Sequence, residues 1–234
     1  LVRRRGRGGK QFRAITVGKI LPARYPNFKL EEQHEGKIVD IVHERGRDAP
    51  LAKVEFDNKS ISYIPAPEGT SVGSTIKTGV GAPATSKNIL SLESIPDGTL
   101  ICNIEKNAGD GGKLIKAAGS SAIVFSHSSE GVTVKLPSGK FLLINQKCRA
   151  MIGAIAGAGR KEKPFLKAGN KSIYMKSRGK LYPHVRGIAQ AAVYHPHGGG
   201  RHQHIGRQSS VSRNTPPGRK VGNIAPRKTG RSRL

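Results

Sequence analysis

The chain has 234 residues, of which 41 are Lys or Arg and 15 are Asp or Glu, so its formal charge is +26. Such an excess repels itself, which argues against an ordinary enzyme of mixed surface charge and predicts a polyanionic partner, above all a nucleic acid. The sequence has no apolar run of 18 residues, and its N-terminal arginines precede no apolar stretch. We therefore expect neither a membrane span nor a secretory signal.

The charge is distributed unevenly along the chain. Residues 1–30 hold nine basic and no acidic residues, residues 31–159 hold fourteen of each, and residues 160–234 hold eighteen basic residues and one acidic residue. Basic segments rich in Gly, Pro and Ser bury too little apolar surface to fold alone, so we expect them to be extended until bound. The prediction is a basic extension at each end and a foldable middle, divided into domains at 31–88 and 89–159.

The first of these domains begins with segments typical of short strands. Residues 37–43 are rich in β-branched side chains, and residues 51–56 and 60–64 alternate apolar and polar side chains. The Asp and Asn at 57–59 predict a tight hairpin turn between the latter two strands. A further strand is predicted at 72–76.

A connector containing Pro and Gly over 82–99 precedes a second set of short strands. Short strands at intervals of about ten residues predict an all-β chain made of two small barrels in tandem. One short helical turn is predicted at 113–118. The strands of the second set are predicted at 100–104, 122–126, 132–136, 140–144 and 150–155.

Two local features of the middle have ordinary interpretations. Cys102 and Cys148 fit no metal-binding spacing and cannot form a disulfide framework, so we expect buried, reduced thiols. The glycine-rich run at 109–113 ends in lysine, but it lacks the GxxxxGK spacing and the long following helix of a phosphate-binding loop. We therefore expect a plain loop there.

The C-terminal extension has a pattern that suits RNA. Basic residues recur every few positions between 160 and 186, which fits contact along a sugar–phosphate surface better than one catalytic pocket. Phe165, Tyr174 and Tyr182 could either stack on bases or anchor the extension to its barrel.

Four of the eight histidines lie within ten residues, at 195–204. These histidines have no neighbouring carboxylates or cysteines to complete a metal site. They also have no adjacent Ser, Cys or Asp that would make one of them catalytic. The favoured interpretation is RNA contact, with three consecutive glycines that permit close packing. We expect no metal site and no catalytic residue. The predicted rRNA-binding residues are Arg3, Arg4, Arg5, Arg7, Lys10, Arg13, Arg160, Lys161, Lys163, Lys167, Lys171, Lys176, Arg178, Lys180, Arg186, His195, His197, Gly198, Gly199, Gly200, Arg201, His202, His204, Arg207, Arg213, Arg219, Lys220, Arg227, Lys228, Arg231 and Arg233.

Six short motifs follow one another along the chain: GDGGK at 109–113, VKLPSG at 134–139, KPFLKAGNK at 163–171, VRG at 185–187, HPHGGG at 195–200 and PGRKVG at 217–222. In this order they resemble the universal large-subunit ribosomal protein family "L two". The run GRHQHIG at 200–206 is similar to the archaeal and eukaryotic cytosolic form of that family.

The resemblance implies an oligonucleotide-binding-like barrel followed by an SH3-like barrel, with extensions that penetrate rRNA. It implies a ribosome-bound, cytoplasmic, non-enzymatic protein that binds rRNA first and supports subunit association, tRNA binding and the peptidyl-transferase region. The implied partners are large-subunit rRNA, neighbouring ribosomal proteins and the small subunit at the intersubunit face. No cofactor is implied, although Mg²⁺ could bridge to rRNA.

The histidine that the family places near the peptidyl-transferase centre corresponds to His195. The segment before it usually reads Ala-Met-Asn-x-Val followed by Asp or Glu, whereas here it ends in Tyr194 and carries Gln190 and Ala191. The missing acidic residue argues against an acidic partner that would orient His195, and so against a direct proton-transfer role.

Overall fold

Strands dominate the computed structural model, which describes residues 12–20, 22–28 and 32–227. The predicted all-β class is therefore confirmed. The chain divides into two compact units, which are considered separately. The larger unit is Thr16–Leu166, and the smaller one comprises the described parts of Leu1–Ile15 and Lys167–Leu234.

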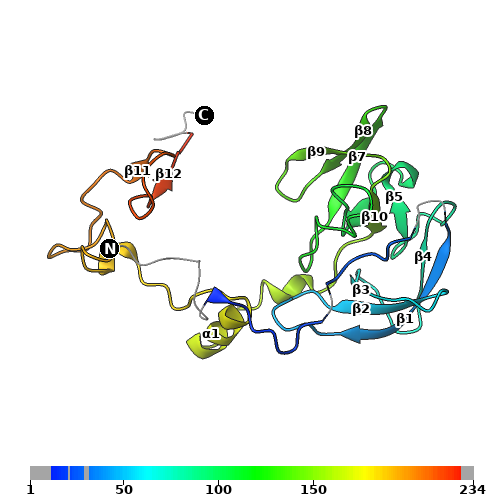
Figure 1. The fold of residues 1–234 in the computed structure, drawn as a ribbon, viewed down its shortest axis with the longest axis horizontal. Coiled ribbons are helices and arrows are strands. Elements are labelled where there is room, and N and C mark those ends of the chain that lie inside the picture. Colours follow the sequence, from blue (N-terminus) through cyan, green and yellow to red (C-terminus); the bar gives the residue numbers. More distant parts are fainter. Residues whose placement is uncertain (1–11, 21, 29–31, 228–234) are drawn as a thin grey trace. The chain divides into compact units, whose positions relative to one another are not determined.

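The strands of the larger unit form one hydrogen-bonded sheet in the order β3-β2-β1-β4-β5-β10-β6-β7-β8-β9 (Figure 1). Neighbouring strands are antiparallel except for β4 and β5, which are parallel. The strands are β1 (His34–Val42), β2 (Leu51–Phe56), β3 (Ile61–Pro65), β4 (Thr75–Thr78), β5 (Ile89–Ser91), β6 (Leu100–Cys102), β7 (Ala122–Ser128), β8 (Gly131–Lys135), β9 (Phe141–Ile144) and β10 (Arg149–Ile152).

The predicted hairpin around residues 57–59 is confirmed. Strand β2 has the predicted bounds, and it pairs with β3 from Leu51 opposite Pro65 to Glu55 opposite Ile61. Strand β4 begins three residues later than predicted, because Gly73 at φ +88° still belongs to the preceding turn.

Two predictions in the second half are wrong. Residues 113–118 form no helical turn, because the amides of Lys113 and Leu114 both donate to the Ile104 carbonyl and Leu114 pairs with Ile104 in a β-bridge. The predicted connector over 82–99 contains β5 and the 3₁₀ helix η2 (Leu92–Ser94). Strand β5 joins the two halves of the sheet, because it pairs with β4 on one side and with β10 on the other.

The larger unit has two hydrophobic cores that share the strands at the middle of the sheet. In β5, Ile89 packs in the first core and Leu90 in the second. In β10, Met151 and Ile152 divide in the same way. Successive side chains of a strand point to opposite faces, so these strands bury both faces.

The two cysteines lie one in each core and are both buried and free, as predicted. Burial disfavours a thiolate, which raises the pKa of Cys102 to about 12 and that of Cys148 to about 11.

The smaller unit contains the helix α1 (Ala168–Ser177) and the parallel pair β11 (Ser210–Val211) and β12 (Asn223–Ile224). The sequence analysis missed α1, since its segment shows no apolar stripe and Lys167 at its start makes no side-chain cap. Two further 3₁₀ helices are η3 (Ala158–Arg160), in the larger unit, and η4 (Gly187–Ala189). In the part of the chain that the structure describes, no helix is long and apolar enough to cross a membrane.

Candidate nucleic-acid interface

The glycine-rich loop before Lys113 uses its own carboxylates to bind its backbone amides. Glu105 accepts hydrogen bonds from the amides of Gly111, at 2.9 Å, and Gly109, at 3.3 Å. Asp110 accepts from the amide of Gly112, at 3.1 Å, and from two further amides of the loop. Burial alone would raise the pKa of Asp110, but these amides and a neighbouring lysine lower it. These amides are thus already paired, which supports the expectation of a plain loop.

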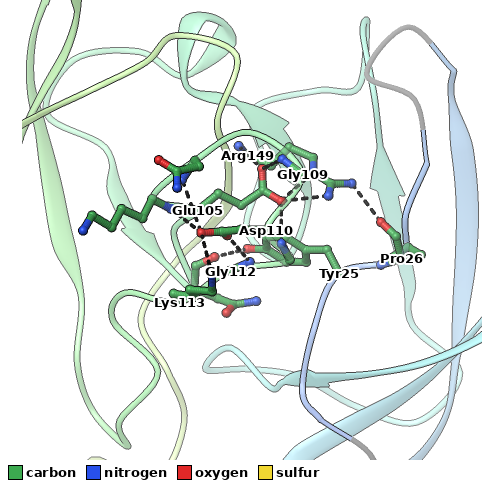
Figure 2. Close-up of polar contacts among 12 residues, drawn as sticks. Tyr25, Pro26, Glu105, Gly109, Asp110, Gly112, Lys113 and Arg149 are labelled. Carbon is green, nitrogen blue, oxygen red and sulfur yellow. Dashed lines mark hydrogen bonds and ion pairs between the residues drawn. The ribbon is translucent and has the colours of Figure 1, made fainter.

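A buried ion pair fixes this loop to the first residue of β10, a strand in the middle of the sheet (Figure 2). The Arg149 guanidinium donates through Nη2 to the Glu105 carboxylate at 2.8 Å, and the Glu105 side chain is completely buried. Arg149 Nη1 donates to the Pro26 carbonyl at 3.0 Å, and the amide of Tyr25 donates to the Gly111 carbonyl at 2.9 Å. The loop therefore holds the segment that precedes β1, which is a structural role.

Two further side chains complete the attachment of this segment. The buried Tyr25 hydroxyl donates to the Asn103 carbonyl at 2.6 Å. Lys116 Nζ donates to the backbone carbonyls of Ala23 and Gly112. Burial, followed by repulsion from two nearby arginines, lowers the pKa of Lys116 to about 8. The polar groups of Tyr25 and Lys116 thus bind backbone carbonyls of this chain, which indicates a structural role.

The first basic residues of the predicted C-terminal extension lie in the larger unit. The guanidinium of Arg160 lies 5.5 Å from the centre of the Phe165 ring, and its Nε is 3.8 Å from Asp48 Oδ1. Lys161 and Lys163 are exposed to solvent. Phe165 therefore contacts a cation of its own chain.

Aromatic and basic residues also pair along and after α1. The guanidinium of Arg178 lies 3.6 Å from the centre of the Tyr174 ring, and Lys171 Nζ lies 5.4 Å from the centre of the Tyr182 ring. Such cation–π contacts hold the rings against their own chain. Both contacts lie within the smaller unit, so anchoring of either tyrosine to the barrel and base stacking both stay predictions.

His195 is packed inside a turn and does not project from it. Only 6% of its surface is exposed, and its Nδ1 accepts a hydrogen bond from the amide of His197 at 3.0 Å. The ring lies directly against Gly187, where a Cβ would overlap it. Gly198 is likewise confined, because a Cβ there would overlap the carbonyls of Gln190 and Ala191. The spacing between VRG and HPHGGG thus reflects packing, which was not predicted from the sequence.

Most of the predicted rRNA-binding residues that the structure describes are exposed, and residues 163–234 contain no acidic residue. Among the described residues, no three His, Cys, Asp or Glu side chains are grouped as metal ligands. Lys171, Arg178, His197, Gly198, Gly199 and Lys220 are partly buried, and His195 is buried. The exposed ones are Arg13, Arg160, Lys161, Lys163, Lys167, Lys176, Lys180, Arg186, Gly200, Arg201, His202, His204, Arg207, Arg213, Arg219 and Arg227. Arg3, Arg4, Arg5, Arg7, Lys10, Lys228, Arg231 and Arg233 lie outside the described residues.

Comparison with known proteins gives matches along almost the whole chain. Residues 2–78 match the family model "Ribosomal Proteins L2, RNA binding N-terminal domain", and residues 85–219 match "Ribosomal Proteins L2, C-terminal domain". The boundary between the two models falls close to β4 and β5, where the two cores meet.

The similarity to known proteins extends over nearly the full length of this chain and of each relative. "Large ribosomal subunit protein uL2" of Nitrosopumilus maritimus is 60% identical, with 100% of this chain and 96% of the relative covered. The protein of the same name from Cenarchaeum symbiosum is 58% identical, over 100% and 96% respectively. That of Sulfolobus acidocaldarius is 50% identical, over 99% and 96%. With two family models and relatives of this identity, the chain belongs to the ribosomal protein L2 family.

Proposed function

We propose that this chain is an rRNA-binding structural constituent of the large ribosomal subunit. Its relatives carry the name "Large ribosomal subunit protein uL2", and the family model over its first third is described as RNA binding. The observation that carries the proposal is the exposed basic surface of residues 167–227, which contain no acidic residue. The balanced charge of residues 31–159 suits a scaffold for this basic segment.

The mechanism is electrostatic and steric. Each Lys or Arg that reaches a phosphate releases condensed counterions, so the affinity for RNA depends on salt. In this proposal two small barrels lie over 31–88 and 89–159, and residues of both segments contribute to the first core. Residues 1–30 and 160–234 act as the rRNA-binding extensions, with Mg²⁺ as a further bridge to phosphates.

In this proposal the chain works on the ribosome in the cytoplasm, beside neighbouring ribosomal proteins and toward the small subunit. The extensions support subunit association, tRNA binding and the architecture of the peptidyl-transferase region. His195 serves there as a packing residue, which its burial against Gly187 supports. Its Nδ1 already accepts a backbone hydrogen bond, which supports this structural role, and we assign no catalysis to His195.

The salt dependence of RNA binding tests the proposal. A variant with four exposed arginines of the extension replaced by Gln should bind protein-free large-subunit rRNA with a shallower slope of log K against log[salt]. The slope should change by roughly 3, since each lost phosphate contact contributes about 0.7–0.9. The substitutions are Arg201→Gln, Arg207→Gln, Arg213→Gln and Arg219→Gln.

The matched control removes the same charge from the neutral middle, at four exposed lysines. Its slope should equal that of the unmodified chain. Equal slopes for all three proteins would show that the extension does not contact phosphates and would refute the proposal. The control substitutions are Lys106→Gln, Lys113→Gln, Lys140→Gln and Lys147→Gln.

A further inference from the structure

The outer face of strands β6–β9 exposes a group of large apolar side chains. Along these strands the alternate residues, such as Val124 and Val134, are completely buried in the second core. The residues between them are exposed on the opposite face. Strands β7, β8 and β9 form one end of the sheet (Figure 1). The exposed apolar residues are Leu100, Ile123, Phe125, Phe141 and Leu143.

Phe125 and Phe141 form an aromatic pair on this face. Their ring centres are 4.9 Å apart and their planes are inclined by 66°. Phe125 is 56% exposed and Phe141 54% exposed, so both rings offer a large part of their surface to solvent. Phe125 lies where the register between β7 and β8 shifts after Val124, and such bulges redirect a side chain.

The polar residues of this face favour an anion. Lys135 is exposed and lies opposite both Ile123 and Phe141 in the strand pairing, so a cationic residue stands in the same cross-strand row as Phe141. Thr133 lies opposite Leu143 on the same face and adds a hydroxyl. Strands β6–β9, all of which are described, contain no acidic residue.

We propose that the outer face of β6–β9 is a stacking platform for unpaired RNA bases, with Phe125 and Phe141 as the stacking residues and Lys135 as the phosphate contact. Proteins bind single-stranded RNA by stacking bases on sheet aromatics beside basic side chains, and every base has a π-face to offer. The proposal rests on the proposed function, and it adds a base-contacting surface outside the basic extensions.

The composition of the face favours RNA over a protein partner. A stable protein interface takes roughly 20–30 residues from each side. Five apolar side chains, one lysine and one threonine fall well short of that, whereas one or two bases need only the exposed rings and a cation. The aromatic rings are also the most exposed apolar residues of the face.

The test replaces both rings by aliphatic side chains, in the full chain. Phe125→Leu with Phe141→Leu keeps the face apolar but removes its π-surfaces, so affinity for protein-free large-subunit rRNA should fall on the order of tenfold to a hundredfold. The slope of log K against log[salt] should stay the same, because the phosphate contacts of the extensions remain. Zero-length ultraviolet crosslinking with mass spectrometry should place nucleotide adducts on residues 125 or 141 of the unmodified chain.

The matched control, Leu100→Ser with Leu143→Ser, removes apolar surface but keeps both rings, and it should bind rRNA as the unmodified chain does. Undiminished binding by the Leu variant, or an absence of adducts at 125 and 141, would overturn the platform while leaving the salt-dependent function intact. An equal loss in both variants would indicate a general apolar docking surface and would also overturn it. The adducts on the unmodified chain remain decisive if a variant fails to fold.

Discussion

Removing Arg149 should destabilise the larger unit more than any surface substitution. Arg149→Met leaves the carboxylate of Glu105 completely buried without its cation and also removes the hydrogen bond to the Pro26 carbonyl. Breaking a buried pair by removing one partner costs about 3–5 kcal/mol. Three backbone amides, those of Gly109, Gly111 and residue 149 itself, continue to hold the carboxylate. We therefore expect a loss near the lower end, about 3 kcal/mol, from a total of about 5–15 kcal/mol.

Urea denaturation of the full chain, followed by circular dichroism of the strands, measures this loss. Arg149→Lys keeps the charge but loses the planar pair of guanidinium donors. Its stability should therefore lie between that of the unmodified chain and that of Arg149→Met. Glu105→Gln combined with Arg149→Met removes the buried charge and should be less destabilised than Arg149→Met alone. A loss below about 1 kcal/mol for Arg149→Met would be typical of an exposed pair and would refute the reasoning.

Two further predictions concern Lys116 and Gly187. The pKa of Lys116 is lowered from 10.5 to about 8 in the folded chain. Between these pH values the unfolded chain therefore binds a proton that the folded chain has lost. The free energy of unfolding should accordingly increase as the pH rises through this range. In urea titrations the free energy of unfolding of the unmodified chain should rise from pH 8 to 10 relative to that of Lys116→Met. Parallel pH profiles of the two proteins would contradict the lowered pKa. Gly187→Ala should displace the His195 ring and speed limited proteolysis of that turn, whereas Gly169→Ala, which meets no neighbouring atom, should not. Equal proteolysis rates would show that the ring is not confined.

Features that depend on local spacing were predictable. The alternation in β2 and the Asp-Asn-Lys turn after it place a hairpin without reference to the rest of the chain, because side chains of a strand alternate between faces. The balance of charge likewise separated residues 31–159 from the basic ends, because net charge is counted locally along the chain. The six ordered motifs identified the family, which the comparisons confirm.

Features that depend on distant partners were not predictable. Strand β5 has three residues, too few for a periodic signal, and exists because β4 and β10 pair with it on either side. The segment at 113–118 has the residues of a helical turn, but its first two amides donate to the Ile104 carbonyl and Leu114 forms a β-bridge with Ile104. In both cases pairing across the sheet outweighed local preference.

The candidate interface shows the same division. Its basic residues and its lack of acids can be read from the sequence, because charge is a property of composition. Whether a side chain is exposed or buried cannot be read from the sequence. His195 is enclosed against Gly187, eight positions earlier, while Phe125 of β7 and Phe141 of β9 meet across β8.

The sequence by itself thus determined the family, the all-β class, the separation of charge and the polyanionic partner class. Only the tertiary structure decided that Glu105 pairs with Arg149, that two cores share β5 and β10, and that an aromatic pair faces outward beside Lys135. The physical reason is that composition and periodicity are local sums along the chain. Burial, ion pairing and ring contacts depend on which distant segments the sheet brings together.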